Sequence, residues 1–168
     1  LPLPSLLDLG PDSGVLVHGA GPDGAGNSGI WLESYESQII EGGTGDILVV
    51  SQDHRLSLTS DVRTGTDGQP YWQKGGKPFQ TGSERINWYA RDPQWKDVLG
   101  FRGAVNIEKP VGQWNRTEVV CRGDRMTTML NGTVMAEAYQ LSRTAGKIQI
   151  QSEGAEIWVR KVELRPLD

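Results

Sequence analysis

Residues 125–138 read RMTTMLNGTVMAEA, and they carry the clearest strand–turn–strand pattern in the chain. Apolar and polar side chains alternate along Arg125–Leu130, which is the period of a β-strand with one buried face. Asn131-Gly132 comes next, and both residues tolerate the positive φ angles of a type I′ turn. Thr133–Ala138 then provides a returning strand. The sequence therefore predicts an antiparallel β-hairpin over 125–138.

Short apolar runs of the same kind lie on both sides of this hairpin, separated by turn residues. The nearer ones predict strands at Asn115–Arg122, Lys147–Gln151 and Glu156–Leu164. Closer to the N-terminus we expect strands at Gly14–His18, Ile30–Ile40, Asp46–Ser51, Arg55–Val62 and Glu84–Tyr89. The rest of the stretch from 63 to 113 predicts long loops, which are usually functional in a small domain. Only Trp95–Leu99 or Val134–Leu141 has a pattern that permits a brief helix.

Glycine and proline are frequent in this chain of 168 residues, with 22 Gly and 9 Pro. Together they make up about 18% of the chain, against about 12% in average proteins. They have no fixed period, so they predict many turns between short strands. The expected architecture is one all-β domain over residues 1–168, a sandwich of antiparallel strands.

Charge, hydropathy and cysteine content exclude several classes of protein. Seventeen basic and 21 acidic residues give a net charge of −4, without the basic footprint of a nucleic-acid-binding protein. No apolar run approaches the ~20 residues of a membrane span. The single cysteine, Cys121, excludes a disulfide framework and a cysteine metal cluster, and two histidines are too few for a three-histidine zinc site. We therefore expect no nucleic acid, membrane, metal or cofactor as a partner.

The expected strand Ile30–Ile40 leads into the densest group of polar residues on an apolar run. Glu36 and Gln38 are two residues apart and share one face of a strand. Glu41 is five residues from Glu36 and points to the other face, unless a bulge between Gln38 and Glu41 returns it. Two carboxylates with an amide between them can act as acid and base, or as nucleophile and acid. The alternative is that Glu33, Glu36 and Glu41 form only the solvated side of an edge strand.

Six tryptophans are many for a domain of this size, and tryptophan platforms are common where sugars are bound. Seven further residues are therefore candidates for substrate binding: His18, His54, Trp72, Trp95, Arg102, Gln151 and Glu153. Trp72 and Trp95 lie in the loop-rich middle and are the expected sugar platforms. Arg102, Gln151 and Glu153 are expected to line a cleft, with solvated strand positions as the alternative. The remaining tryptophans on strand-like runs are expected in the core: Trp31, Trp88 and Trp158.

The E-x-Q-x-x-E spacing of Glu36, Gln38 and Glu41 resembles the E-x-D-x-x-E signature of glycoside hydrolase family 16, the laminarinase-like glucanases. The longer run YESQIIEGGTGD at 35–46 resembles more closely the core motif of the 3-keto-disaccharide hydrolase domain family, formerly a domain of unknown function. The residues at 12–18 resemble that family's N-S-G strand, with Asp12 in place of Asn. Further matches in the same order are GQWNR at 112–116, the turn at 131–132, and the runs 146–154 and 158–162. The resemblance covers residues 12 to 165.

The resemblance implies a concanavalin A-like jelly-roll sandwich of two antiparallel sheets, with a carbohydrate on the concave sheet. The family's opening strands have no counterpart here, so we expect a sandwich that lacks its N-terminal strands. Members are similar to hydrolases that cleave glycosides oxidised to a ketone at C3. Glu36 is then the general base or acid, Glu41 its partner, and Gln38 an orienting donor. The family is typically periplasmic or secreted, although Leu1–Leu7 does not read as a signal peptide.

Two other functions remain open from the sequence. A laminarinase-like retaining glucanase needs its two carboxyl groups about 5–5.5 Å apart, and the amide of Gln38 argues against that route. A non-catalytic carbohydrate-binding module needs only the sandwich and the tryptophans. Convergence of Glu36 and Glu41 in one pocket favours an enzyme, and their divergence favours the binding module.

Overall fold

The computed structural model describes residues 12–22, 30–52, 54–110, 112–153 and 156–167. These residues form ten strands and no helix, so the brief helices considered at 95–99 and 134–141 are not found. The strands are β1 (Asp12–Ala20), β2 (Glu33–Ile40), β3 (Ile47–Val50), β4 (Leu58–Thr64), β5 (Pro70–Trp72), β6 (Lys77–Thr81), β7 (Thr117–Arg122), β8 (Arg125–Leu130), β9 (Thr133–Ala138) and β10 (Lys147–Glu153).

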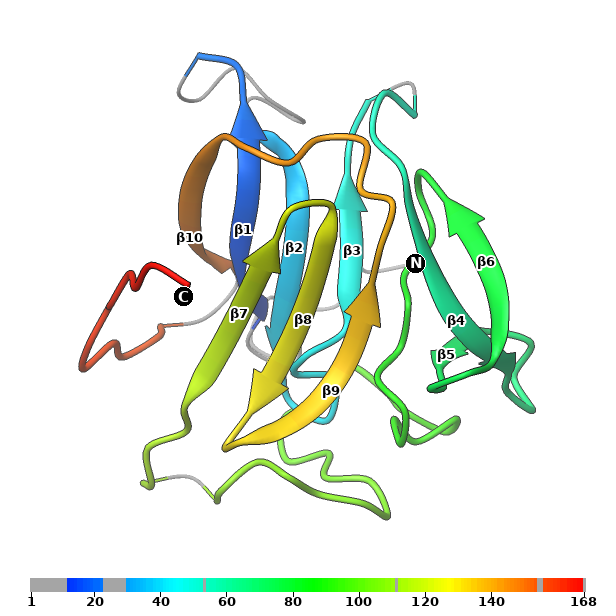
Figure 1. The fold of residues 1–168 in the computed structure, drawn as a ribbon. Helices are drawn as coiled ribbons and strands as arrows, with labels where there is room; N and C mark the ends of the chain where they lie inside the picture. Colours follow the sequence, from blue (N-terminus) through cyan, green and yellow to red (C-terminus); the bar gives the residue numbers. More distant parts are fainter. Residues whose placement is uncertain (1–11, 23–29, 53, 111, 154–155, 168) are drawn as a thin grey trace, which may run out of the picture.

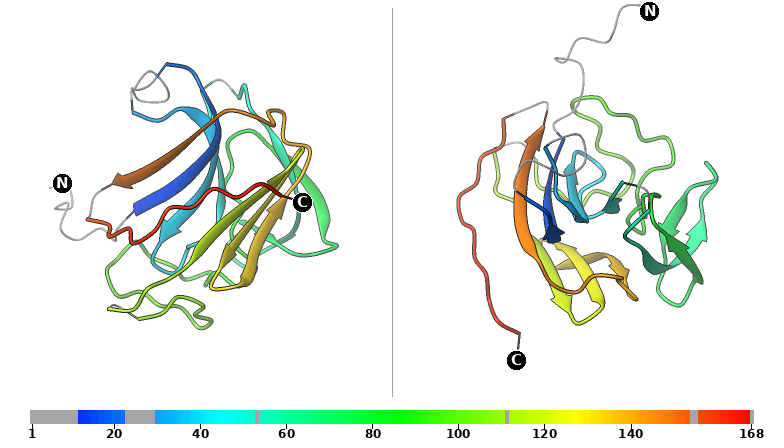
Figure 2. Two further views of the ribbon diagram at one scale, coloured as in Figure 1. Left: turned by 60° about the vertical axis from the view of Figure 1, so that its left-hand side comes forward. Right: turned by 90° about the horizontal axis from the view of Figure 1, so that it is seen from above.

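All strand pairs within the sheets are antiparallel, which confirms the predicted all-β class. The strands make three sheets rather than two, in the orders β10-β1-β2-β3, β5-β4-β6 and β7-β8-β9 (Figures 1 and 2). β4 meets the end of β9 through the single bridge Thr59–Tyr139. Gln140 follows with a φ of 53°, and the chain stays beside β4, because the Ser142 amide donates a hydrogen bond of 3.0 Å to Ser57 O.

The central hairpin is confirmed with the predicted strand bounds. Asn131 and Gly132 have φ angles of 51° and 83°, the two positive values that a type I′ turn requires. Leu130 and Thr133 close the turn as cross-strand partners. The preference of Asn-Gly for a type I′ turn therefore predicts this hairpin correctly.

The predictions for two other segments were wrong. Glu156–Leu164 forms no strand, and Trp158, expected in the core, is 78% exposed. Glu84–Tyr89 makes only isolated bridges, Ile47–Ile86 and Tyr71–Asn87, although Ile86 is fully buried. The strands β5 and β6 lie in the stretch that we expected to be loops, because Pro, Gly and Lys mask the strand pattern there.

The core lies between the four-stranded sheet and the two smaller ones. One face of β1, β2 and β3 contributes Val17, Tyr35, Ile47 and Val49 to it. The opposite wall comes from β4, β8 and β9, with Leu58, Val62, Met126, Ala136 and Ala138. Because side chains alternate along β2, the Tyr35 face is the core face and Glu36 and Gln38 lie on the other. Packing of the sheet thus fixes which face carries the candidate site.

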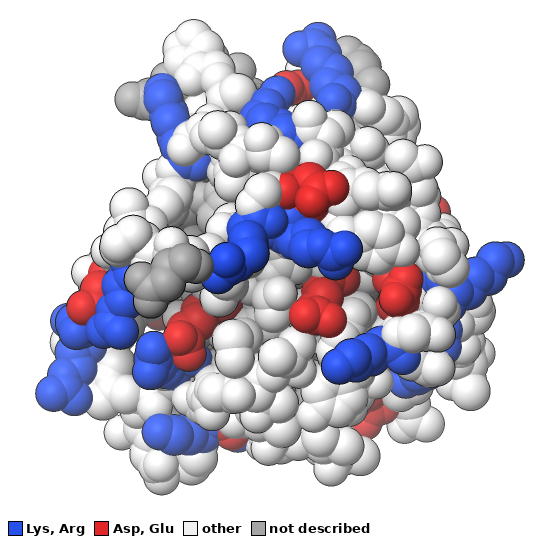
Figure 3. All heavy atoms as spheres, viewed as in Figure 1, with Lys and Arg blue, Asp and Glu red and all other residues white. Residues whose placement is uncertain are grey.

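The surface shows no large field of one sign on the face seen in Figure 3, where basic and acidic side chains are interspersed. Within the described ranges, no helix has the length and hydropathy needed to cross a membrane.

Candidate functional site

Three neighbouring strands place polar residues on the sheet face opposite the core. The register makes Gly14 of β1 the partner of Gln38 on β2 and of Gln151 on β10. Asp12, two residues earlier on β1, is paired with Glu153 of β10. Residues that are far apart in the sequence therefore meet around Gly14.

Glu36 is the centre of this group. It is only 4% exposed, and Gln151 Nε2 donates a hydrogen bond of 2.7 Å to its Oε1. The carboxyl group lies directly over Gly14, where an added Cβ would approach Oε1 to 1.9 Å. Gly14 thus leaves the space that the carboxyl group occupies.

Replacing Gly14 by Ala is expected to displace the Glu36 carboxyl group and to lower the free energy of unfolding by about 1–3 kcal/mol, as overpacking does. The backbone of Gly14 does not lie in the left-handed region, so the effect comes from the Cβ alone. Chemical denaturation measures it. In a Glu36→Ala background the same substitution should cost much less, and an equal cost in both backgrounds would contradict this account.

The electrostatics of Glu36 are unusual. Burial, followed by the negative charge of Asp12, raises the pKa of Glu36 from its usual 4.5 to about 8, with a smaller contribution from Glu153. The Arg85 guanidinium acts in the opposite direction. A pKa of about 8 means that the neutral, protonated form of Glu36 predominates at pH 7.

Gln38 is 2% exposed, and its side-chain Nε2 donates to Oδ1 of Asp12. The predicted role of Gln38 as a donor thus has a partner within the chain. Burial and the charge of Glu153 raise the pKa of Asp12, while Arg85 opposes that rise. Asp12 and Glu36 therefore each accept a hydrogen bond from one glutamine, and these two glutamines lie on the strands on either side of Gly14.

A buried ion-pair network supports the site from the side of β3. Asp46 is fully buried, and it accepts hydrogen bonds from Arg91 and, at 3.1 Å, from Arg85 Nη1. The Trp88 amide also donates to it at 2.7 Å. Gln38 N donates to the backbone oxygen of Asp46 at 3.0 Å, which places Asp46 beside β2. Asp46 therefore anchors Arg85, whose charge acts on both Glu36 and Asp12.

Glu41 does not join this group. The β1–β2 register is continuous from Gln38 to Ile40, so the bulge considered between Gln38 and Glu41 is absent. Glu41 follows the strand, accepts a hydrogen bond of 2.6 Å from the Gly100 amide, and lies 3.8 Å from Arg102 Nη1. The charged groups that act on Glu36 are Asp12, Arg85 and Glu153, not Glu41.

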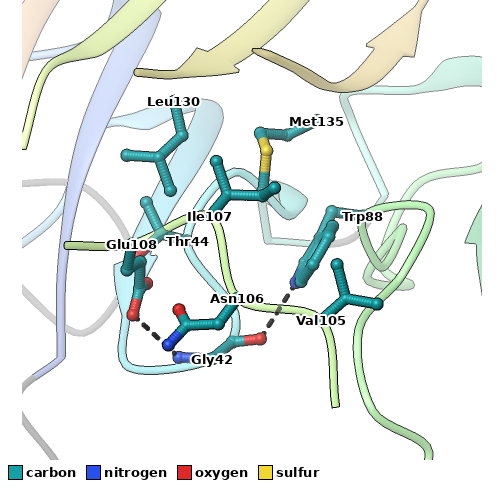
Figure 4. Close-up of a pocket in the computed structure, with 9 residues that line it drawn as sticks. All are labelled: Gly42, Thr44, Trp88, Val105, Asn106, Ile107, Glu108, Leu130 and Met135. Atoms are coloured by element: carbon teal, nitrogen blue, oxygen red, sulfur yellow. Dashed lines mark hydrogen bonds between the residues drawn. The ribbon is translucent and has the colours of Figure 1, made fainter. Parts of the chain in front are cut away.

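Glu41 and Arg102 instead line a cavity of about 300 Å³, together with Trp158 and residues 108–110. A second pocket, of only about 10 Å³, lies where Trp88 Nε1 donates to Gly42 O and Glu108 accepts from the Gly42 amide (Figure 4). Glu36 lines neither of them.

Neither histidine is among the hydrogen-bond or charged partners of Glu36. The His18 ring meets the edge of Tyr35 at a centroid distance of 6.3 Å, toward the core face, and burial lowers its pKa. Its Nε2 is buried without a hydrogen-bond partner among the described residues. His54 is exposed in the connection between β3 and β4. The predicted role of the two histidines in substrate binding stays a prediction.

The two predicted sugar platforms have partners within the chain. Trp72 packs against the core and meets Tyr89 edge to face at 6.2 Å. Trp95 donates from Nε1 to Glu41 O at 2.8 Å, and the Arg91 guanidinium lies 4.1 Å from its ring centroid. One face of the Trp95 ring is thus already covered by a cation.

Gln151 and Glu153 are the predicted binding residues that the structure brings to Glu36. Sequence reasoning missed Asp12, Gly14 and Arg85 as site residues. Asp12 and Gly14 lie in the N-S-G-like strand, so a signal existed for them, whereas Arg85 carries none. No group of three or more potential metal-ligating side chains that could hold a metal ion occurs in the part of the chain that the structure describes.

Comparison with known proteins agrees with the motifs. The sequence pattern of the 3-keto-alpha-glucoside-1,2-lyase-like domain matches residues 5–165. No curated protein matches the chain, and neither does any solved structure. The match covers nearly the whole chain and confirms the resemblance drawn from residues 35–46. The chain therefore belongs to the family of 3-keto-alpha-glucoside-1,2-lyase-like domains.

Proposed function

We propose that this protein cleaves 3-keto-glycosides by proton abstraction, elimination and hydration, with Glu36 as a proton-transferring residue. Family membership makes the chain a 3-keto-glucoside lyase- or hydrolase-like, carbohydrate-active domain. The observation that carries the finer proposal is the buried Glu36 carboxyl group, whose pKa is raised to about 8. The concanavalin A-like jelly roll with a sugar on its sheet, implied by the sequence resemblance, is part of the same proposal.

The chemistry follows from a ketone at C3, which acidifies the proton at C2. A base removes that proton, the C–H electron pair forms a C2–C3 double bond, and the charge moves to the C3 oxygen. The electrons then return to form a C1–C2 double bond and expel the oxygen at C1, which takes a proton from an acid. Water adds across the new double bond and gives the free 3-keto sugar. The route needs a base, an acid and a cation or donor for the C3 oxygen, but no strong nucleophile.

The residues around Gly14 supply groups of each kind. Glu36 and Asp12 are carboxyl groups with raised pKa values. Arg85 is a partly exposed guanidinium that acts electrostatically on both, and it suits an enolate oxygen. Gln151 Oε1 is buried without a hydrogen-bond partner among the described residues, so it can accept a bond from a sugar hydroxyl.

The position of Glu41 argues against the retaining glucanase and in favour of the carbohydrate-binding module. A retaining glucanase needs two converging carboxyl groups, and the contacts of Glu41 with Gly100 and Arg102 do not support that pair. A carbohydrate-binding module is favoured by the same separation of Glu36 and Glu41. The binding-module alternative does not explain the raised pKa of Glu36, because binding a neutral sugar requires no proton transfer.

Incubation with a glucose disaccharide and with the same disaccharide oxidised at C3 separates these functions. We expect release of the leaving sugar from the oxidised substrate only. Chromatography of the reaction mixture measures this release. Release from the unoxidised disaccharide would favour the glucanase. Binding of either sugar without any release would favour the binding module and would contradict the proposal.

A further inference from the structure

Two carboxyl groups, those of Asp12 and Glu36, lie close to Gly14 on β1, and the charge of Asp12 acts on Glu36. Asp12 lies two residues before Gly14 on β1, and Glu36 lies over Gly14 from β2. Each is held by a glutamine whose backbone is the register partner of Gly14: Gln38 holds Asp12 and Gln151 holds Glu36. No part of the E-x-Q-x-x-E spacing predicts this arrangement, because Asp12 is outside it.

We propose that Asp12 is the second catalytic carboxylate, which takes the C2 proton, and that Glu36 gives its proton to the leaving oxygen at C1. This inference rests on the proposed function. It gives Asp12 the place of partner to Glu36 that the sequence pattern gave to Glu41. The assignment is specific to this chain, because the N-S-G strand that residues 12–18 resemble has Asn where this chain has Asp12.

The proton balance closes over the two halves of the reaction. In the elimination, the Asp12 carboxylate gains the C2 proton while the Glu36 carboxylic acid loses its proton to the departing oxygen, and the C1–O bond breaks. In the hydration, the Glu36 carboxylate takes a proton from the water that bonds to C1, and Asp12 returns its proton to C2. Both groups end in their starting states, and the net change is the addition of one water.

The different surroundings of the two groups support this division. Glu36 is nearly inaccessible and keeps its proton at neutral pH, since its pKa is about 8. Asp12 is only half-buried; burial and the charges of Glu153 on β10 and Asp97 raise its pKa, while the charge of Arg85 lowers it. A pair of carboxyl groups whose environments differ in this way is the usual arrangement of an acid and a base.

The experiment compares Asp12→Asn with Glu36→Gln on 3-keto-glucosides that carry leaving groups of different acidity. Asparagine keeps an oxygen to accept the Gln38 hydrogen bond, so the fold is retained while the base is lost. We expect Asp12→Asn to lower kcat by about 10²- to 10⁴-fold for every leaving group, with little change in KM. Glu36→Gln should lower kcat by a similar factor for a sugar leaving group and far less for 4-nitrophenol, which leaves without an acid.

The matched control is Asp61→Asn, which alters a half-buried strand aspartate that accepts a hydrogen bond of 2.8 Å from Tyr139. It should leave kcat unchanged. A carbon-13 NMR titration of Glu36 gives a readout that needs no turnover: the pKa of Glu36 should fall in Asp12→Asn, because the Asp12 charge raises it.

The outcomes are distinguishable. Three results would overturn the assignment of Asp12 alone, provided that the wild type is active. The first is an equally active Asp12→Asn variant, and the second is an unchanged titration of Glu36 in that variant. The third is the same dependence of kcat on the leaving group in Asp12→Asn and Glu36→Gln. A wild type that cleaves no 3-keto-glucoside would overturn the proposed function, and this assignment with it.

Discussion

Glu36→Gln is expected to lower turnover of a 3-keto-disaccharide by about 10²- to 10⁴-fold, because it removes a proton-transferring group. Glutamine has nearly the same shape, and it keeps an oxygen to accept the hydrogen bond from Gln151. The variant should therefore fold, and circular dichroism and denaturation should show this. Wild-type turnover in the folded variant would end the assignment of Glu36.

The same substitution is expected to change how stability depends on pH. In the unfolded chain the carboxyl group ionises near 4.5, while in the folded protein the pKa is about 8. Below pH 4.5 both states hold the proton, and the contribution of the neutral group to stability is fully present. As the pH rises from 4.5 to about 8, the unfolded state loses its proton first, so the stability of the folded state falls.

At about 1.4 kcal/mol per pH unit, this loss is on the order of 5 kcal/mol by pH 9. Glu36→Gln has no group to ionise, so it should be more stable than the wild type above pH 8 by several kcal/mol. Urea denaturation between pH 4 and pH 9 measures the difference. Glu118→Gln, which changes a carboxylate paired with Arg116 at the surface, should follow the wild-type curve. Parallel curves for Glu36→Gln and the wild type would show that Glu36 is not the titrating group.

The sequence predicted well the features that depend on neighbours along the chain. Asn131 and Gly132 form the expected turn because the required φ angles depend on these two residues themselves. Glu36 and Gln38 share a face because a strand alternates with period two. Both predictions rest on distances of one or two residues.

Features that depend on strand pairing could not be read from the sequence. Gln151 is 115 residues from Glu36, and only the β10-β1-β2 register brings the two together. Trp158 satisfied the pattern of a buried strand residue, but the segment 156–167 forms no strand and leaves it exposed. Glu41 was placed by assuming a bulge, whereas the chain simply leaves the sheet after Ile40. Periodicity gives the faces of a strand, but it does not say which strands are adjacent.

Asp46→Asn is expected to cause the largest loss of stability, about 3–5 kcal/mol, because it leaves a buried guanidinium without its counter-charge. Arg91 is only 5% exposed and cannot turn to water without disrupting its contacts with Asn87 and Trp95. Arg85 also loses its anchor at 3.1 Å, so the charge near Glu36 should become mobile. Denaturation at neutral pH measures the loss, which for a chain of this size corresponds to a Tm lower by roughly 6–20 °C.

A double variant tests whether the unpaired charge is the cause. Arg91→Met in the Asp46→Asn background removes the buried cation and fills its space with an apolar side chain of similar length. The double variant should therefore be more stable than Asp46→Asn alone, as replacement of whole buried ion pairs often shows. If the two substitutions instead add their separate costs, Asp46 and Arg91 are not energetically coupled. The loss in Asp46→Asn would then not come from an unpaired Arg91 charge, and this ion-pair network would not be what keeps Arg85 in place.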